Sequence, residues 1–159
     1  MSDIIIRIAE PADANAVSEI AKECWRGIYE GYLTEMGEEI YNAVYPTDPL
    51  AVKGDKVAGV VREGKAFVAV RDGEICGFAT YAVEGKIGVL KDNAVKIGCQ
   101  GLGIAGRLYD AVFAKLREVG CSIVRVGTGL DDAHAPARRA YAKMGFERGI
   151  SNVTYYKKL

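Results

Sequence analysis

The sequence predicts a mixed α/β fold in which a mostly antiparallel central sheet of about seven strands is flanked by helices on both faces. Short runs of β-branched and aromatic residues, bounded by turn residues, recur along the chain and predict the strands. Longer segments with apolar residues at three- and four-residue spacing predict the helices. The sequence contains no internal repeat or linker, so we expect residues 1–159 to form a single domain.

Most of the first part of the chain is predicted to be helical. Residues 4–9 form a β-branched run that predicts the first strand. Residues 14–29 place apolar side chains on one helical face and predict the first helix. The irregular stretch that follows predicts a short helix, and Asp48-Pro49 then begins another helix that extends to about residue 63.

Three strands are predicted next, over residues 65–71, 74–83 and about 86–95. Asp72-Gly73 between the first two is a strong signal for a two-residue hairpin turn, because both positions of that turn need positive φ. Glu84-Gly85 marks a second tight turn. The three strands should therefore form an antiparallel meander.

The last part of the chain alternates helices and strands. Residues 103–119 carry apolar side chains that step by four, which predicts an amphipathic helix. Residues 122–127 predict a strand and residues 135–144 a short helix. Residues 146–148 and 153–157 are expected to form the last pair of strands.

The overall charge and the cysteine content exclude several function classes. The chain has 21 Lys and Arg and 21 Asp and Glu, so its formal net charge is zero and gives no electrostatic argument for a nucleic-acid or membrane partner. No segment approaches the roughly 18 apolar residues of a membrane span. The four cysteines form no CxxC pair and His134 is the single histidine. We therefore expect no metal site and a cytoplasmic location.

A glycine-rich segment directly precedes the predicted helix over residues 103–119. Its glycines permit positive φ and close approach of a ligand to the backbone. A helix N-terminus carries unpaired N–H groups and favours negative charge, so the segment is a candidate phosphate site. The run Gly101-Leu102-Gly103-Ile104-Ala105-Gly106 fits G-x-G-x-x-G, the dinucleotide fingerprint.

The dinucleotide interpretation lacks its expected context. A dinucleotide site needs a βαβ unit with an acidic residue about 20 positions on, at the end of the next strand. Here that strand ends in Gly127-Thr128-Gly129, and the first acidic residue after it is Asp131. An antiparallel meander also precedes the glycines, which is wrong for a parallel doubly wound sheet. We therefore disfavour a nucleotide-dependent dehydrogenase.

A second pattern within the glycine segment and two other segments support a different interpretation. The run from Gln100 to Ala105 also fits the pattern Q/R-x-x-G-x-G/A. Residues 137–146 fit A-x-x-x-Y-x-x-x-G-F, and the hairpin over residues 71–78 reads Arg-Asp-Gly-Glu-Ile-Cys-Gly-Phe. Together these segments resemble the GNAT superfamily of acetyl-CoA-dependent N-acetyltransferases over nearly the whole chain. The resemblance implies the acyl-CoA N-acyltransferase fold, with acetyl-CoA as co-substrate.

The resemblance implies an enzyme that transfers acetyl from acetyl-CoA to a primary amine of a small-molecule or peptidic substrate by direct attack in a ternary complex. The alternative is a catalytically silent acyl-CoA-binding or regulatory module of the same fold. Family members are often dimers, so a homodimer is compatible with the resemblance.

The resemblance also assigns roles to individual residues. It implies that Tyr141 is the general acid that protonates the leaving thiolate, and that a backbone N–H near Asn93 is the oxyanion donor. His134 stands where many members have an asparagine that hydrogen-bonds the pantetheine arm, and a neutral imidazole can donate and accept as well. The full set implied for the cofactor is Ala94, Val95, Gln100, Gly101, Leu102, Gly103, Ile104, Ala105, Gly106, His134 and Ala137.

The acceptor site is less sharply indicated by the sequence. Trp25, Tyr29 and Tyr32 cluster at the end of the first predicted helix and are expected to line the substrate cleft. An alkylamine is almost entirely protonated at pH 7, so a general base or a water relay is expected. The carboxylates near predicted strand ends are the candidates for that base, namely Glu84, Asp92, Asp131 and Asp132.

Overall fold

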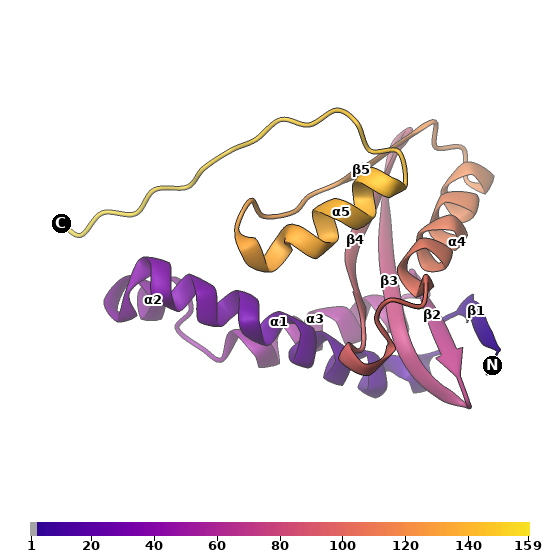
Figure 1. Cartoon of the computed structure of the whole chain (residues 1–159), viewed down its shortest axis with the longest axis horizontal. Coiled ribbons are helices and arrows are strands. Elements are labelled where there is room, and N and C mark those ends of the chain that lie inside the picture. The colour runs from indigo at the N-terminus through magenta and orange to yellow at the C-terminus, as the bar shows by residue number, and fades with distance from the viewer. Residues whose placement is uncertain (1–2) are drawn as a thin grey trace.

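The structure of the protein, a computed structural model, describes residues 3–159. Five strands of this range form one sheet, in the order β1-β2-β3-β4-β5. The first four pair antiparallel and β5 pairs parallel to β4 (Figure 1). Their bounds are Ile4–Ile8, Ala66–Arg71, Glu74–Glu84, Ile87–Val95 and Ile123–Val126. The mixed sheet and its meander are as predicted from the sequence.

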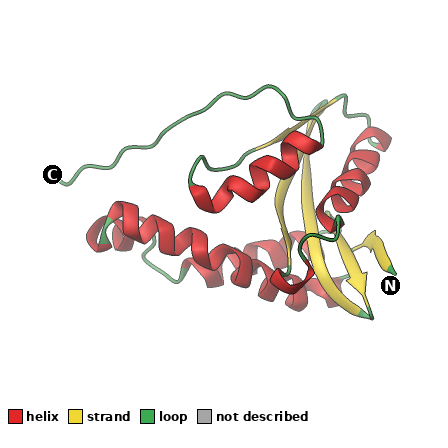
Figure 2. Ribbon diagram, in the orientation of Figure 1, coloured by secondary structure: helices red, strands yellow, loops and turns green. Residues whose placement is uncertain are grey.

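Helices cover both faces of the sheet (Figure 2). Neighbouring residues of β3 point to opposite faces, so Phe78 packs in one apolar cluster and Ala79 in the other. The Phe78 cluster lies under α1 and α3, and the Ala79 cluster lies under α4 and α5. None of the helices in residues 3–159 is long and apolar enough to cross a membrane. The helices are α1 (Ala14–Met36), α2 (Glu38–Val44), α3 (Pro49–Arg62), α4 (Ile104–Glu118) and α5 (Ala135–Lys143).

Local chemistry explains where several elements begin and turn. Asp48 caps α3, because its side chain accepts a hydrogen bond from the Leu50 N–H at 2.9 Å and Pro49 occupies the first turn. Asp72 and Gly73 have φ of 52° and 81°, the positive values that the predicted hairpin turn requires. These short-range signals were readable in the sequence.

The prediction of two C-terminal strands is wrong. The sheet has five strands rather than about seven, because residues 146–148 and 153–157 form no strand. The segment after α5 runs away from β5 in an extended path (Figure 1), and Ile150, Val153 and Tyr155 are exposed. β-branched and aromatic residues form a strand only where a second strand supplies hydrogen bonds, and this segment has no such neighbour in the described chain. Its end contacts α2 through an ion pair between Lys158 and Glu39.

A β-bulge divides β4 into a half that pairs with both β3 and β5 and a half, called here the free half, that has no strand neighbour on the β5 side. Ala79 of β3 faces Asn93, but Tyr81 faces Leu90, so Lys91 and Asp92 together oppose Thr80. The Thr80 hydroxyl donates to the Asp92 carbonyl at 2.9 Å and holds the bulge. Pairing with β5 stops at the same place, because only residues 87–90 of β4 pair with it. Residues 91–95 therefore have no strand neighbour on the β5 side.

An ion pair fixes the entry to α1. Arg7 donates two hydrogen bonds to the Asp13 carboxylate, at 2.7 and 3.0 Å, and the Glu10 N–H donates a third at 2.7 Å. The hydrogen bond from Arg7 outweighs the opposing effect of burial and lowers the pKa of Asp13. Folding therefore stabilises the ionised form of the Asp13 carboxyl group.

We expect Asp13→Asn to lower the free energy of unfolding at pH 7 by about 1–2 kcal/mol. Because the pKa of Asp13 is lower in the folded state, its contribution is fully present above about pH 4 and is lost as the pH falls through the folded-state pKa. Urea unfolding of both proteins at pH 7 and at about pH 2.5 measures this, with Asp110→Asn on the exposed side of α4 as the control. A deficit that persists unchanged at low pH would contradict the assignment.

Candidate functional site

The glycine loop joins β4 to the N-terminus of α4. Gly101 and Gly103 have φ of 79° and 72°, in the left-handed region, and Gly103 is the residue immediately before the helix. A Cβ added to either glycine would meet no protein atom within 4 Å. The backbone conformation thus requires glycine, and the space beside the loop is open. The Gln100 side chain donates to the Val95 carbonyl at 3.1 Å and ties the loop to the end of β4.

A cavity of about 960 Å³ lies beside this loop. The free half of β4 borders it, together with the glycine loop, α5 and one face of α1. Ten of the eleven residues predicted for the cofactor line it, and Leu102 is the exception, since it does not line the cavity and is 48% exposed. The cavity residues that the sequence analysis named are Trp25, Asp92, Asn93, Ala94, Val95, Gln100, Gly101, Gly103, Ile104, Ala105, Gly106, His134, Ala137 and Tyr141.

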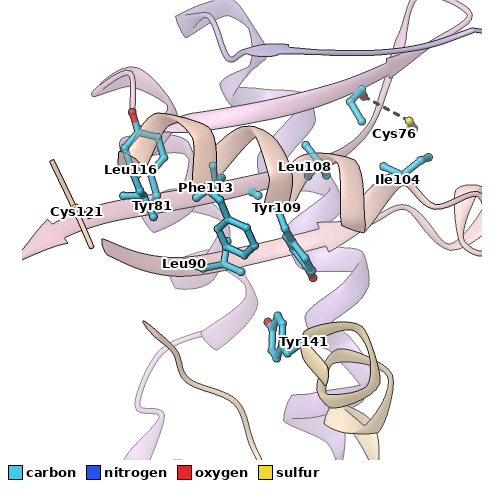
Figure 3. Packing of buried hydrophobic residues seen from close by; sticks show 13 residues of the cluster. Cys76, Tyr81, Leu90, Ile104, Leu108, Tyr109, Phe113, Leu116, Cys121 and Tyr141 are labelled. Atoms are coloured by element: carbon cyan, nitrogen blue, oxygen red, sulfur yellow. Dashed lines mark hydrogen bonds between the residues drawn. The ribbon is translucent and has the colours of Figure 1, made fainter. Parts of the chain in front are cut away.

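Tyr141 reaches this cavity from α5, inside a small polar cluster. Its hydroxyl accepts a hydrogen bond from Nδ2 of Asn93 at 3.1 Å, and the Tyr109 hydroxyl donates to Oδ1 of Asn93 at 2.7 Å. The two tyrosines point toward one another from α5 and α4 (Figure 3). Burial raises the pKa of both phenols above the ordinary value for tyrosine. Tyr141 is therefore protonated at neutral pH and able to give a proton.

His134 lies on the same cavity, in the 3₁₀ turn Asp132–His134 that precedes α5. Its Nδ1 is 2.7 Å from Oδ2 of Asp131, and its backbone N–H donates to Oδ1 at 3.2 Å. Arg138 donates to the Asp131 carbonyl at 2.8 Å and so holds this turn in place. Burial acts to raise the pKa of Asp131, but the bonds from His134 outweigh it and the pKa is lowered. An ionised Asp131 fixes the histidine ring.

The other candidate bases differ in their surroundings. Asp92 lines the cavity, but its carboxylate is 2.7 Å from Nζ of Lys53 and 3.7 Å from Nζ of Lys56. Glu84 is exposed at the far end of β3 and pairs with Arg125 at 2.7 Å. Asp132 is exposed. Of the four, only Asp92 lines the cavity, and Asp131 is linked to it through its contact with His134.

The predicted aromatic group divides into two parts. Trp25 lines the cavity, and the Lys53 ammonium lies 4.8 Å from its ring centroid. Tyr29 and Tyr32 do not line it, and they belong to a separate group in which Tyr29 packs edge-on against Tyr32 and Tyr45 at 6.0 and 5.4 Å. Burial raises the pKa of Tyr29 to about 12. This second group extends the α1 face toward α2.

Tyr109 and Lys53 are not among the residues predicted from the sequence. Tyr109 lies beside the apolar stripe of α4, where a tyrosine is expected simply to pack, and Lys53 lies on α3, where a lysine is expected in solvent. Their polar partners come from a distant segment, because Tyr109 contacts Asn93 and Lys53 contacts Asp92 only in the folded chain. No local pattern signals such contacts.

A strand edge without a neighbour, leading into a glycine loop at a helix N-terminus, defines a site for an extended ligand that carries phosphate groups. Comparison with known proteins gives the class. The model of the acetyltransferase (GNAT) family matches residues 14–146. The chain therefore belongs to the acetyltransferase (GNAT) family, and it is an acetyl-CoA-dependent N-acetyltransferase. A search of curated protein sequences gave no significant match.

Solved structures share the fold. The PaiA N-acetyltransferase from Thermoplasma acidophilum, in complex with coenzyme A, is 17% identical with a TM-score of 0.75, and the match covers 94% of this chain and 93% of that one. A GNAT family acetyltransferase from Brucella melitensis, in complex with acetyl-CoA, is 20% identical with a TM-score of 0.63 and coverage of 92% and 84%. The aminoglycoside N-acetyltransferase AAC(6')-Iy, in complex with CoA, is 18% identical with a TM-score of 0.64 and coverage of 100% and 97%.

Proposed function

We propose that the protein transfers the acetyl group of acetyl-CoA to a primary amine of a small-molecule or peptidic substrate, by direct attack while both are bound. One observation carries the proposal: the glycine loop, the free half of β4, Tyr141 and Trp25 of α1 all border the same cavity. A donor bound along β4 would thus meet an acceptor that enters from α1. The aminoglycoside N-acetyltransferase among the similar folds is an example of a protein whose acceptor carries amines.

The donor is expected to lie along β4 and end at the glycine loop. The backbone N–H groups at Gly101–Gly106 would surround the pyrophosphate, favoured by the dipole of α4. The amides of the pantetheine arm would pair with residues 91–95, which have no strand neighbour on the β5 side. Within this placement, the backbone near Asn93 supplies the oxyanion donor for the thioester carbonyl, and Tyr141 is the general acid.

Direct attack requires a neutral amine. The pKa of a lysine-like amine is about 10.4, so only about one molecule in two thousand is neutral at pH 7. Of the candidate bases, Asp131 would act through His134, which its carboxylate contacts. The carboxylate accepts from Nδ1, which leaves the Nε2 lone pair of a neutral ring as the proton acceptor. We therefore assign His134 as the base and Asp131 as the residue that orients it.

Replacing His134 by asparagine separates this role from a simple contact with the pantetheine arm. Asparagine retains hydrogen bonding but cannot take up a proton, so we expect kcat/KM for the amine to fall about 50-fold with little change in the Kd of CoA. The deficit should shrink as the pH rises, because more amine is then neutral without help. Steady-state rates from pH 6 to 9 measure it, and full activity in His134→Asn would leave His134 as a cofactor contact only.

An acceptor screen tests the function itself. Release of CoA thiol and acetylation of the product by mass spectrometry are followed for aminoglycosides, polyamines, amino-acid amides and short peptides. Transfer to at least one amine class, abolished when acetyl-CoA is replaced by CoA, is the expected result. A protein that binds CoA but acetylates no member of the panel would instead be the catalytically silent acyl-CoA-binding or regulatory module of this fold.

A further inference from the structure

The side-chain amide of Asn93 lies at the centre of the polar cluster beside the cavity. Three groups contact it: the Lys91 carbonyl and the Tyr141 hydroxyl on Nδ2, at 2.8 and 3.1 Å, and the Tyr109 hydroxyl on Oδ1, at 2.7 Å. Residues of β4, α4 and α5 thus meet at one amide. Each hydrogen bond in this cluster constrains the direction of the next.

Chemistry fixes the direction of every bond. The Lys91 carbonyl can only accept, so the Asn93 atom that faces it must be the nitrogen, and a flipped amide would bring two acceptors to 2.8 Å. Oδ1 then faces Tyr109, whose hydroxyl must donate. The second N–H of Asn93 donates to Tyr141, whose oxygen must accept.

The consequence is that Asn93 does not take the proton of Tyr141. The Tyr141 oxygen accepts from Asn93, and the group of this cluster that can accept the Tyr141 proton is the neutral hydroxyl oxygen of Tyr109, which is hydrogen-bonded to it. Tyr109 differs, because its proton is already given to Asn93. Both tyrosines border the cavity, but the Tyr109 proton is bound to Asn93, whereas the Tyr141 proton can turn from the neutral Tyr109 oxygen to a ligand in the cavity.

We propose that Asn93 is a positioning residue, held by Tyr109 and the Lys91 carbonyl, that directs the Tyr141 proton toward the leaving sulfur. This rests on the proposed function of the site. As the amine nitrogen bonds to the thioester carbon and the carbon–sulfur bond breaks, the Tyr141 proton passes to the sulfur and gives the CoA thiol. The amine releases its extra proton to the base. The resulting Tyr141 phenolate keeps the Asn93 N–H as a donor and is reprotonated from solvent.

Asn93→Asp reverses the polarity of the cluster with almost no change in size. An ionised carboxylate loses the bond to the Lys91 carbonyl and accepts from both tyrosines, so the Tyr141 proton is held by residue 93 rather than offered to the sulfur. We expect kcat to fall at least about 100-fold with little change in the Kd of CoA. Added to Tyr141→Phe, the same change should have little further effect on kcat, because the proton that it misdirects is already absent.

Tyr109→Phe is the milder companion variant. It removes one bond to Oδ1 while the Lys91 carbonyl still fixes the amide, so kcat should fall only about threefold to tenfold. This variant keeps the ring and its packing, and it preserves the test if Asn93→Asp does not fold. A loss as large as that of Tyr141→Phe, or a multiplicative effect in the Tyr141→Phe background, would overturn the proposal.

Measuring the pKa of Tyr141 without substrate tests the hydrogen-bond arrangement of the cluster independently of the reaction. In protein labelled with [13Cζ]tyrosine, the Tyr141 resonance is identified by its loss in Tyr141→Phe. Asn93→Asp should raise the pKa of Tyr141 by at least about one unit, because a donor is replaced by a negative charge. An unchanged pKa would refute the arrangement of the cluster. A raised pKa with normal kcat would refute instead the role of Tyr141 as acid.

Discussion

Replacing Tyr141 by phenylalanine is expected to lower kcat for amine acetylation about 10³-fold while the Kd of CoA stays within about twofold. The variant removes the proton donor but keeps the ring. That ring packs against Tyr109 and Phe146, with centroids 5.7 and 5.9 Å apart, so the surrounding cluster should persist. Thiolate must then leave without protonation, which slows the chemical step and not donor binding.

Tyr81→Phe is the matched control for this result. Tyr81 is a buried tyrosine of the same apolar cluster, but it does not border the cavity. Removing the Tyr81 hydroxyl in Tyr81→Phe should leave kcat unchanged. Initial rates at saturating acetyl-CoA, with CoA binding by calorimetry, give both quantities for each variant. A Tyr141→Phe enzyme with near-normal kcat would show that the leaving group departs unaided or takes its proton elsewhere.

Replacing Gly103 by valine is expected to weaken CoA binding about 10²–10³-fold. A β-branched residue is strained at a φ of 72°, at a cost of about 1–3 kcal/mol, so the loop would leave the conformation that presents its N–H groups. The added side chain would also occupy the open space beside the loop, where the pyrophosphate is expected. Strain and obstruction act on the same ligand group.

Gly98→Val in the same segment is the control. Gly98 lies in the 3₁₀ turn Ile97–Cys99 without positive φ, and a Cβ there would also meet no protein atom within 4 Å. Its replacement should change the Kd of CoA less than about threefold. Calorimetric titration of both variants with CoA gives the comparison. Equal affinities for Gly98→Val and Gly103→Val would contradict the assignment of the pyrophosphate to Gly101–Gly106.

The sequence predicts the fold well wherever local chemistry decides it. The hairpin at Asp72-Gly73, the start of α3 at Asp48 and the left-handed turn before α4 all depend on a few adjacent residues, and all are confirmed. The failures are non-local. Residues 153–157 have the β-branched and aromatic residues of a strand, but a strand also needs a neighbouring edge, and nothing in the segment itself shows that none is there.

The candidate site shows the same division. The glycine loop and Tyr141 stand out because each belongs to a sequence motif, and both border the cavity. The link between Asn93 and Tyr109 has no motif, since its partners are 16 residues apart on different elements. Tyr29 and Tyr32 are near Trp25 in sequence, yet they do not line the cavity, and Tyr29 packs against Tyr32 and Tyr45.

The most direct test of the account is thermal unfolding with CoA, acetyl-CoA and NADH in parallel. A ligand that binds only the folded protein adds about 2.7 kcal/mol to its stability at one hundred times its Kd. We predict stabilisation by CoA and acetyl-CoA, its loss in Gly103→Val and no effect of NADH. Stabilisation by NADH alone, or no response to either CoA species, would contradict the assignment of this cavity to acetyl-CoA.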